Sequence, residues 1–354
     1  MAASPHHTLD TLVQGRDLAE TEAAALLISL TAPEIAPAMA GALLAALRAK
    51  GVTAAEVRGF AGAMRALARK PALPEALDAI DIVGTGGDAS GSLNLSTGAA
   101  LLAAACGLPV IKHGNRSISS RSGSADLIER LGFTLPLDET QAARCFAATG
   151  FTFLFAPYFH PAMKALAPIR AALGIRTVFN LLGPLTNPAA PRCRLIGAYD
   201  AATAELMAGT LAGMDIERAW VVHGAAGWDE ATPIGPFLAF DVTRGAIRRC
   251  EIDPRDFGIA PCEAGDLAGG DAHANLGALL EVFAGRDRGA HFAALALQCG
   301  LALFISGRAA SIQMGIDMAR SAVDSGRADE WLRRLRQFAA DCPDHETVLN
   351  GRMS

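Results

Sequence analysis

Aromatic side chains are scarce in this sequence, and it has no excess of positive charge. Only 6% of the 354 residues are Phe, Trp or Tyr, and 31 Lys and Arg stand against 36 Asp and Glu, for a formal net charge of −5. Proteins that bind nucleic acids generally carry a basic footprint, so the composition argues against a nucleic-acid partner. A site for an anionic ligand must therefore be a local feature of an otherwise acidic protein.

The chain also lacks paired cysteines and long apolar runs. Its seven cysteines include no C-x-x-C pair, which is typical of reduced thiols inside a cell. The longest apolar run, around Ala99–Cys106, is far shorter than the ~18 residues that a membrane helix needs. Residues Met1–Leu12 show no basic stretch followed by an apolar one, the pattern of a secretory signal. We therefore expect a soluble, cytoplasmic protein with no membrane partner.

Apolar residues recur with helical spacing through the first part of the chain. From residue 8 to about 70, Leu, Ala and Met repeat every three to four positions. Asp17 and Thr53 are the expected helix N-caps, and Gly51 is an expected C-cap. A proline-containing connector follows at Pro71–Pro74. The sequence therefore predicts a small helical domain at the start.

From Ile80 onward, short apolar strands alternate with helices, the pattern of a mostly parallel sheet. The expected strands are Ile80–Val83, Leu108–Ile111, Phe151–Phe155, Arg194–Ala198 and Ala219–His223. The segment Pro233–Gly258 alternates apolar and polar residues, which predicts a strand-rich excursion. We predict an α/β fold, with a small N-terminal α-helical domain (1–74) and a large α/β domain (75–354) whose mostly parallel central sheet is flanked by helices. Turn-forming residues predict that hinge-region helices near 170–190 join the two.

The first expected strand ends in a glycine-rich turn, Gly84-Thr85-Gly86-Gly87-Asp88-Ala89. Glycines at such a turn let backbone N–H groups approach a phosphate closely. The turn matches the loose dinucleotide pattern, but no Asp or Glu lies between Asp88 and Asp126 to hold a ribose. The Gly-Lys-Ser/Thr of a P-loop is also missing. We therefore expect neither a dinucleotide site nor a P-loop.

Basic and hydroxyl side chains fill the interval between Asp88 and Asp126 instead. The basic residues are Lys112, His113, Arg116 and Arg121. The hydroxyl and amide residues are Ser90, Ser92, Asn94, Ser96, Thr97, Asn115, Ser117, Ser119, Ser120, Ser122 and Ser124. Helix capping would account for two or three of these residues, but not for eleven around two neighbouring turns. Because such turns form a crevice at the ends of parallel strands, we predict a site for a ligand with several phosphates and a sugar.

Four segments of this interval together resemble the signature of the anthranilate phosphoribosyltransferases, in order and in spacing: Gly84–Asp88, Asn94–Thr97, Lys112–Arg116 and Ser122–Asp126. The resemblance runs from about residue 10 to 330. The further segments that are similar to the family's are His160–Lys164, Arg170, Gly174–Asn180, Gly183–Pro188, His223-Gly224 and Trp228–Glu230. The resemblance implies transfer of the phosphoribosyl group of 5-phosphoribosyl 1-pyrophosphate (PRPP) to the amine of anthranilate, a step of tryptophan biosynthesis, by a homodimer.

The resemblance also implies which residues contact each ligand. Those expected to contact PRPP are Gly84, Gly87, Asp88, Ser92, Asn94, Leu95, Ser96, Thr97, Lys112, His113, Gly114, Asn115, Arg116, Ser117, Ile118, Ser119, Ser120 and Ser124. Those expected to contact anthranilate are Gly84, Asn115, His160 and Arg170. The expected ligands of one or two Mg²⁺ ions are Ser96, Asp229 and Glu230, beside substrate phosphates. His160, which precedes Pro161, also fits a packed structural histidine.

The acceptor that the resemblance implies is an aromatic amine with an available lone pair, so no dedicated nucleophile or strong general base is expected. The sequence agrees, since it contains no G-x-S-x-G, H-E-x-x-H or paired C-x-x-C motif. Catalysis should come from positioning and electrostatics. Two alternatives stay open: a pyrimidine nucleoside phosphorylase, and a catalytically inactive family-like protein that binds nucleic acid or another partner. Gln298-Cys299 and Asn275-Leu276 depart from the Asn-Ala pairs common in the family. We expect both departures to be packing changes in helices away from the phosphate loops.

Overall fold

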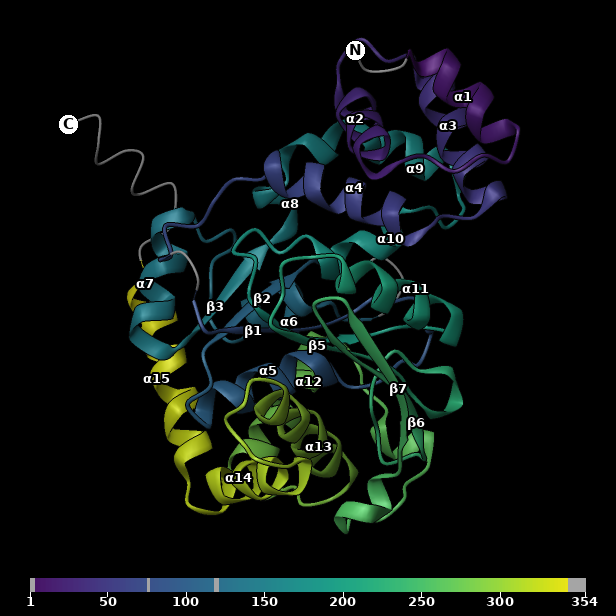
Figure 1. Ribbon diagram of the computed structural model, residues 1–354. Coiled ribbons are helices and arrows are strands. Elements are labelled where there is room, and N and C mark those ends of the chain that lie inside the picture. Colours follow the sequence, from purple (N-terminus) through teal and green to yellow (C-terminus); the bar gives the residue numbers. More distant parts are fainter. Residues whose placement is uncertain (1–3, 75–76, 118–120, 343–354) are drawn as a thin grey trace, which may run out of the picture.

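The computed structural model describes residues 4–74, 77–117 and 121–342 (Figure 1). Four helices come first: α1 (Pro5–Val13), α2 (Glu20–Thr31), α3 (Pro37–Lys50) and α4 (Ala54–Ala66). They confirm the predicted helical start, with Thr53 as the N-cap of α4 and Gly51 after the end of α3. The prediction for Asp17 is wrong. Ala19 is the N-cap of α2, and Asp17 instead pairs with Lys50 at 2.7 Å.

Glu56 joins three of these helices although its side chain is fully buried. Its Oε1 accepts the backbone N–H of Leu18, just before α2, at 2.9 Å. Its Oε2 accepts the N–H of Thr53 at 2.8 Å and the Lys50 Nζ at 3.0 Å. Because a buried carboxylate is tolerated only when its oxygens are paired, this arrangement fixes the mutual positions of α2, α3 and α4.

Seven strands form one sheet in the order β3-β2-β1-β4-β5-β6-β7. Their bounds are β1 (Ile80–Gly84), β2 (Val110–Gly114), β3 (Phe151–Phe155), β4 (Cys193–Gly197), β5 (Arg218–His223), β6 (Phe237–Thr243) and β7 (Ala246–Ile252). β1 to β5 are parallel, and β6 and β7 add an antiparallel hairpin at one edge. This confirms the mostly parallel sheet, and the hairpin is the predicted strand-rich excursion.

Helices cover both faces of the sheet (Figure 1). The remaining α-helices are α5 (Leu95–Ala105), α6 (Ser124–Arg130), α7 (Glu139–Thr149), α8 (Ala156–Phe159), α9 (Ala167–Leu173), α10 (Phe179–Leu182), α11 (Ala201–Ala212), α12 (Ala272–Phe283), α13 (Ala290–Ile305), α14 (Ile312–Asp324) and α15 (Arg327–Asp341). Short 3-10 helices are η1 (Pro161–Leu166), η2 (Gly183–Leu185), η3 (Ala225–Gly227), η4 (Pro254–Phe257) and η5 (Ala264–Leu267). Among the described residues, no helix combines the length and apolar character needed to cross a bilayer.

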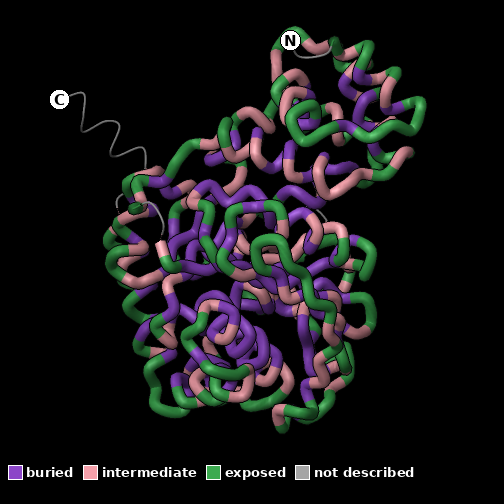
Figure 2. Tube along the Cα trace, in the orientation of Figure 1, coloured by how far each residue is buried: buried purple, intermediate pink, exposed green. Residues whose placement is uncertain are grey.

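Two apolar cores lie on opposite faces of the sheet, because successive strand residues point to opposite sides. On β5, Trp220 and Val222 join the core that contains α5, α13 and α14, while Ala219 and Val221 join the core that contains α2, α3 and α4. The chain between η1 and η2 also packs into the second core, where the Phe179 ring meets Phe60 edge to face at 6.1 Å. Figure 2 shows these buried stretches running through the centre of the molecule.

Helices α13 and α14 cross where Gly300 meets Gly315, so closely that a Cβ on Gly315 would collide with the Gly300 carbonyl oxygen. We predict that Gly315→Ala lowers the free energy of unfolding by about 1–3 kcal/mol, because overpacking pushes the helices apart. The matched control is Gly277→Ala on α12, where an added Cβ has no neighbour within 4 Å. It should raise the free energy of unfolding by up to ~1 kcal/mol, the helix propensity of Ala over Gly. Urea unfolding followed by circular dichroism compares them, and equal stabilities would contradict the close crossing.

Candidate active site

Two loops leave the carboxyl ends of the parallel strands on the same edge of the sheet. The glycine turn, residues 84–88, follows β1, and the acidic loop, residues 224–230, follows β5. Only β4 lies between these two strands. Open α/β sheets bind their ligands at this edge, so the geometry brings the two predicted motifs to the expected place.

Three glycines let the acidic loop lie directly on the strand ends. A Cβ on Gly84 would collide with the carboxylate of Asp229, and a Cβ on Gly197 would collide with the Asp229 backbone. A Cβ on Gly224 would collide with the carbonyl oxygen of Glu230. These positions therefore need glycine because another chain segment occupies the space of a side chain.

Asp229 bridges the acidic loop and the glycine turn. Its Oδ2 accepts the backbone N–H of Gly86 at 2.6 Å, and its own N–H donates to Asp88 Oδ2 at 3.4 Å. Burial, and then the nearby charge of Asp88, raise the pKa of Asp229 to about 7. The acidic loop is thus tied to the glycine turn through both the side chain and the backbone of Asp229.

Glu230 is tied to the first turn of α5 and to α13. Its Oε1 accepts the Ser96 hydroxyl at 2.8 Å and the Ser96 N–H at 3.0 Å, and its Oε2 accepts the Gln298 amide at 3.4 Å. Burial, and then the charge of Asp229, raise the pKa of Glu230 to about 8. A small cavity of about 10 Å³ lies beside these groups.

These oxygen donors fit a hard divalent cation. Asp229, Glu230 and the Ser96 hydroxyl present carboxylate and hydroxyl oxygens. Burial first, and then repulsion from a neighbouring carboxylate, raise the pKa values of Asp229 and Glu230, and a bound cation would relieve both effects. In the described part of the chain, no three His, Cys, Asp or Glu side chains form a metal-holding group by themselves. A cation here would therefore complete its coordination with water or with a bound ligand.

Asn94, which caps α5, is fixed by contacts from two other segments. Its amide donates to the Ser122 carbonyl at 3.0 Å, and its Oδ1 accepts the Ser122 hydroxyl at 3.0 Å and the Asn275 amide at 2.8 Å. Asn275 and Gln298 therefore both contact residues of the site. The expectation that they lie away from the phosphate loops is wrong, because α12 and α13 pack against the start of α5.

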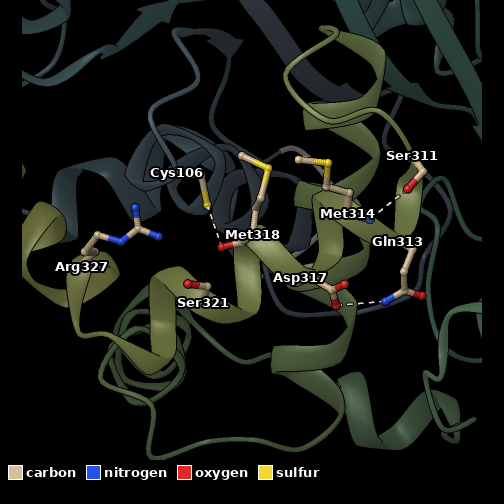
Figure 3. Close-up of a pocket in the computed structure, with 8 residues that line it drawn as sticks. All are labelled: Cys106, Ser311, Gln313, Met314, Asp317, Met318, Ser321 and Arg327. Carbon is tan, nitrogen blue, oxygen red and sulfur yellow. Dashed lines mark hydrogen bonds between the residues drawn. The ribbon is translucent and has the colours of Figure 1, made fainter.

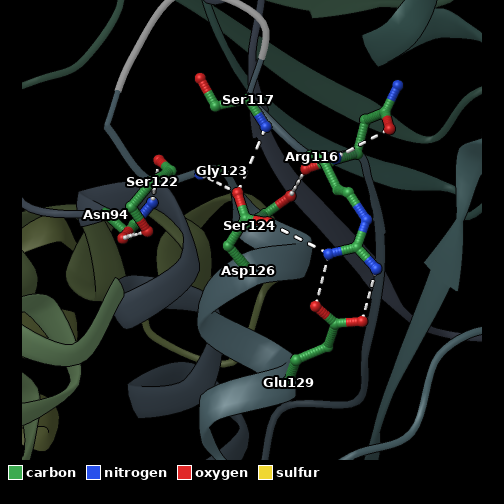
Figure 4. Close-up of polar contacts among 9 residues, drawn as sticks. Asn94, Arg116, Ser117, Ser122, Gly123, Ser124, Asp126 and Glu129 are labelled. Carbon is green, nitrogen blue, oxygen red and sulfur yellow. Dashed lines mark hydrogen bonds and ion pairs between the residues drawn. The ribbon is translucent and has the colours of Figure 1, made fainter. Parts of the chain in front are cut away.

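Lys112 and Arg116, two of the basic residues expected to contact PRPP, both have partners in this structure. Lys112 is fully buried at the end of β2, where its Nζ donates to the Ile82 carbonyl and burial lowers its pKa. Arg116 is exposed but bound to carboxylates: its guanidinium donates to both oxygens of Glu129, at 2.5 and 2.6 Å, and to Asp126 at 3.2 Å (Figure 4). Arg116 must therefore leave Glu129 before it can meet a phosphate.

Two buried histidines lie beneath the site. The rings of His113 and His160 pack edge to face with centroids 5.1 Å apart, and His113 Nδ1 lies 3.1 Å from the Gly183 carbonyl. Within the described chain, neither His160 nitrogen forms a hydrogen bond of standard geometry, although the backbones of Thr186 and Met64 are near. Burial lowers the pKa of His113 to about 3 and that of His160 to about 4. Both rings are therefore neutral at pH 7.

Similarity to known proteins extends over the whole fold. The sequence matches the "Glycosyl transferase family, helical bundle domain" over residues 6–68 and the "Glycosyl transferase family, a/b domain" over residues 76–329. The anthranilate phosphoribosyltransferase of Desulforudis audaxviator is 45% identical over 343 residues, which cover 96% of this chain and 99% of the relative. The chain belongs to the anthranilate phosphoribosyltransferase family.

Solved structures of the family share this fold. The crystal structure of the Thermus thermophilus anthranilate phosphoribosyltransferase is 39% identical, with a TM-score of 0.88 and coverage of 94% of this chain and 99% of that one. The Saccharomyces cerevisiae enzyme in complex with PRPP and Mg is 26% identical, with a TM-score of 0.86 and coverage of 96% and 98%. The family resemblance and the fold expected from the sequence are both confirmed.

The predicted PRPP residues gather at three adjacent places. The glycine turn and the start of α5 hold Gly84, Gly87, Asp88, Ser92, Asn94, Leu95, Ser96 and Thr97; the end of β2 and the loop after it hold Lys112, His113, Gly114, Asn115, Arg116 and Ser117; and Ser124 opens α6. Ile118, Ser119 and Ser120 lie outside the described residues. Sequence reasoning did not assign Gln298 and Asn275 to the site, because they lie on α13 and α12, far from the motifs in sequence. The sequence signals were a departure from the family's Asn-Ala pair at Gln298 itself and, for Asn275, at the neighbouring Leu276.

The histidine pair generates a prediction about acid stability. An unfolded imidazole has a pKa near ~6.5, above both folded-state values, so the unfolded chain binds more protons below that pH. The free energy of unfolding should be unaffected by the pair above pH 6.5. It should then fall by up to about 1.4 kcal/mol per pH unit for each ring as the pH drops toward 4. Urea unfolding between pH 7 and 5 should show a shallower dependence in His113→Gln and His160→Asn.

The control for the histidine pair is His273→Gln, because that side chain is exposed on α12. This variant should keep the pH dependence of the parent protein. If both buried-site variants also keep it, the two rings do not contribute to acid unfolding.

Proposed function

We propose that this chain transfers the phosphoribosyl group of PRPP to the amine of anthranilate, which gives N-(5-phosphoribosyl)anthranilate and pyrophosphate in tryptophan biosynthesis. Family membership over nearly the whole chain supports the reaction. The observation that carries the proposal is the pair of carboxylates in the acidic loop: buried Asp229 is held against the glycine turn, and half-buried Glu230 is held at the start of α5 by Ser96. Such a pair suits a metal-bound pyrophosphate far better than a neutral ligand.

Mg²⁺ would be held by Ser96, Asp229 and Glu230, as one or two ions, together with phosphate oxygens of PRPP. When bound, the metal supplies charge neutralisation for the departing pyrophosphate. The chain's own part is to orient these donors: Gly86 holds the Asp229 carboxylate and Gln298 holds that of Glu230. Backbone N–H groups of the glycine turn and the fixed side chain of Asn94 would bind the remaining phosphate and ribose oxygens.

Anthranilate would be recognised through its carboxylate by Arg170, with Asn115, His160 and Gly84 completing the pocket. Among the described residues no carboxylate pairs with Arg170, and burial lowers the pKa of its guanidinium. The guanidinium carbon lies 5.3 Å from the centre of the Phe179 ring, which restricts its plane. A planar cation that is partly desolvated and unpaired is suited to a bidentate contact with a substrate carboxylate.

Positioning, without a general base, would account for catalysis. The amine of anthranilate has an available lone pair at neutral pH, so no side chain has to remove a proton before attack. Arg176 lies in the segment between α9 and α10. Its guanidinium donates to the Gly87 carbonyl, and its Cζ lies 4.0 Å from the centre of the Tyr199 ring. This contact would hold the glycine turn closed over the reacting sugar and keep water from it.

The remaining parts of the proposal concern organisation. We place the domain boundary between residues 74 and 75, with the segment near 170–190 as the hinge that joins the helical and α/β domains. The proposed assembly is a cytoplasmic homodimer. Chemical cross-linking and size-exclusion chromatography of the full chain test the assembly directly.

Incubation with anthranilate, PRPP and Mg²⁺, followed through the loss of anthranilate fluorescence, tests the reaction. We predict turnover that requires all three components. Arg170→Ala should raise the KM for anthranilate by about 10–100-fold, the equivalent of a lost charged hydrogen bond, and leave the KM for PRPP nearly unchanged. Arg286→Ala is the matched control, since Arg286 is exposed and its guanidinium is paired with Glu281.

No turnover of the parent protein in any Mg²⁺ concentration would overturn the proposed reaction. Turnover of a pyrimidine nucleoside with phosphate would instead favour a nucleoside phosphorylase. An equal effect of Arg170→Ala on both KM values would remove Arg170 from the anthranilate site.

Gln298 yields a separate prediction about the metal. Its amide is the α13 contact of Glu230, so Gln298→Ala should raise the Mg²⁺ concentration for half-maximal activity by roughly 10-fold, as is typical of lost supporting contacts. Direct Mn²⁺ titration by electron paramagnetic resonance should show the same loss of affinity in the presence of PRPP. Gln313→Ala, which removes an amide bonded to Asp317 on the surface of α14, is the control. Unchanged Mn²⁺ affinity in Gln298→Ala would contradict this role.

A further inference from the structure

Two thiols face each other between α5 and α13, on the side of these helices away from the glycine turn. Cys106 Sγ and Cys299 Sγ are 4.0 Å apart and share a hydrogen bond. Cys299 is fully buried, and Cys106 is half-buried. None of the seven cysteines forms a disulfide. This close pair has no part in the proposed transferase reaction.

A surface cavity of about 480 Å³ gives small molecules access to Cys106. The cavity is bounded mainly by α14 and the start of α15; its lining is Cys106, Ser311, Gln313, Met314, Asp317, Met318, Ser321 and Arg327. Figure 3 shows the Cys106 sulfur turned toward α14, where it lies 3.8 Å from the Met318 carbonyl. Cys299 is absent from the lining, so a reagent that enters the cavity meets Cys106 first.

The surroundings give the two sulfurs different chemistry. The hydrogen bond from Cys299, and then the charge of Arg327, lower the pKa of Cys106, which favours its thiolate. Asp317 also lines the cavity, but Gln313 bonds it at 3.0 Å and Arg320 pairs with it at 3.5 Å. Burial raises the pKa of Cys299 well above its usual range, so that sulfur stays a protonated thiol.

The backbone allows the sulfurs to come together. A disulfide bond is about 2.05 Å long, so they must approach by roughly 2 Å. Cys106 is the C-cap residue of α5, and Gly107 after it has a positive φ of 88°, so this end of the helix is not held by further helical turns. Cys299 lies inside α13 and supplies the fixed partner.

We propose that Cys106 and Cys299 form a peroxide-reactive thiol pair. The Cys106 thiolate attacks one oxygen of hydrogen peroxide, the O–O bond breaks, and the protein is left with a Cys106 sulfenic acid while hydroxide leaves. The Cys299 sulfur then attacks the Cys106 sulfur, the S–O bond breaks, and the thiol proton leaves with the hydroxyl group as water. The hydroxide takes up the proton that Cys106 released when it formed its thiolate. The two thiols are therefore oxidised to one disulfide, and one peroxide is reduced to two molecules of water.

The position of the pair connects it to the acidic loop. Cys299 directly follows Gln298, which donates to Glu230, and α5 carries at its other end Ser96, which donates to the same carboxylate. A Cys106–Cys299 bond therefore joins the two helices that hold Glu230. The thiol chemistry itself does not depend on the transferase reaction.

Treatment of the reduced full-length protein with hydrogen peroxide, followed by alkylation and non-reducing peptide mass mapping, tests the pair. We expect peptides containing Cys106 and Cys299 to be joined, lighter than the separate reduced peptides by two hydrogen atoms, and released by dithiothreitol. C299S should stop at a Cys106 sulfenic acid that dimedone traps. C106S should leave Cys299 reduced. C262S, which changes a half-buried cysteine elsewhere, should keep the cross-link.

The proposal is overturned if Cys106 is alkylated equally before and after peroxide treatment. It is also overturned if dimedone first labels Cys299, or if Cys299 forms a cross-link in C106S. Circular dichroism of each variant confirms that it is folded before oxidation. Because the readout is peptide mass, a protein without transferase activity gives the same test.

Discussion

The placement of the acidic loop on the strand ends is the contact on which the rest of the site depends. Gly84 at the end of β1 and Gly197 at the end of β4 leave room for Asp229, and Gly224 directly after β5 leaves room for the backbone of Glu230. That closeness brings Asp229 to the glycine turn and buries it, and it leaves Glu230 half-buried against the start of α5. Burial then raises their pKa values, which makes the site a poor one for two bare charges and a good one for a cation. The same packing therefore sets geometry and electrostatics together.

Much of the fold follows from local patterns in the sequence. The strand Phe151–Phe155 has the bounds that its apolar run predicts. Thr53 caps α4 because its hydroxyl accepts the backbone N–H of Glu56, while the Glu56 carboxylate accepts the backbone N–H of Thr53. Asp17 shows the limit of that reasoning. It is a good capping residue by type, but α2 begins beyond its reach and its carboxylate meets Lys50 from another helix instead. Contacts between distant segments decide whether a residue of capping type actually caps a helix, and the spacing of residues along the chain does not reveal those contacts.

Part of the site could likewise be predicted from local sequence, and part depends on contacts between distant segments. The glycine turn and the start of α5 are visible as motifs because strand, turn and helix are continuous in sequence. Gln298 and Asn275 could not be placed, since only the packing of α12 and α13 against α5 brings them to Glu230 and Asn94. The positive charge of Arg116 could be read from the sequence. Its ion pair with Glu129 could not, because that pair depends on a side-chain rotamer that the sequence does not specify. Residue types thus predicted which residues lie at the site better than they predicted the contacts that each residue makes.

The hairpin at the end of the sheet has a consequence for how copies of this chain can meet. β7 is an edge strand, and an open strand edge is a template on which another chain can add a strand. Here its exposed residues include Arg248 and Arg249, with Arg248 bound to Asp241 across the hairpin. Fixed charges on an edge oppose such addition, because an incoming strand would have to bury them. Continuation of the sheet from one molecule to the next is therefore disfavoured at β7.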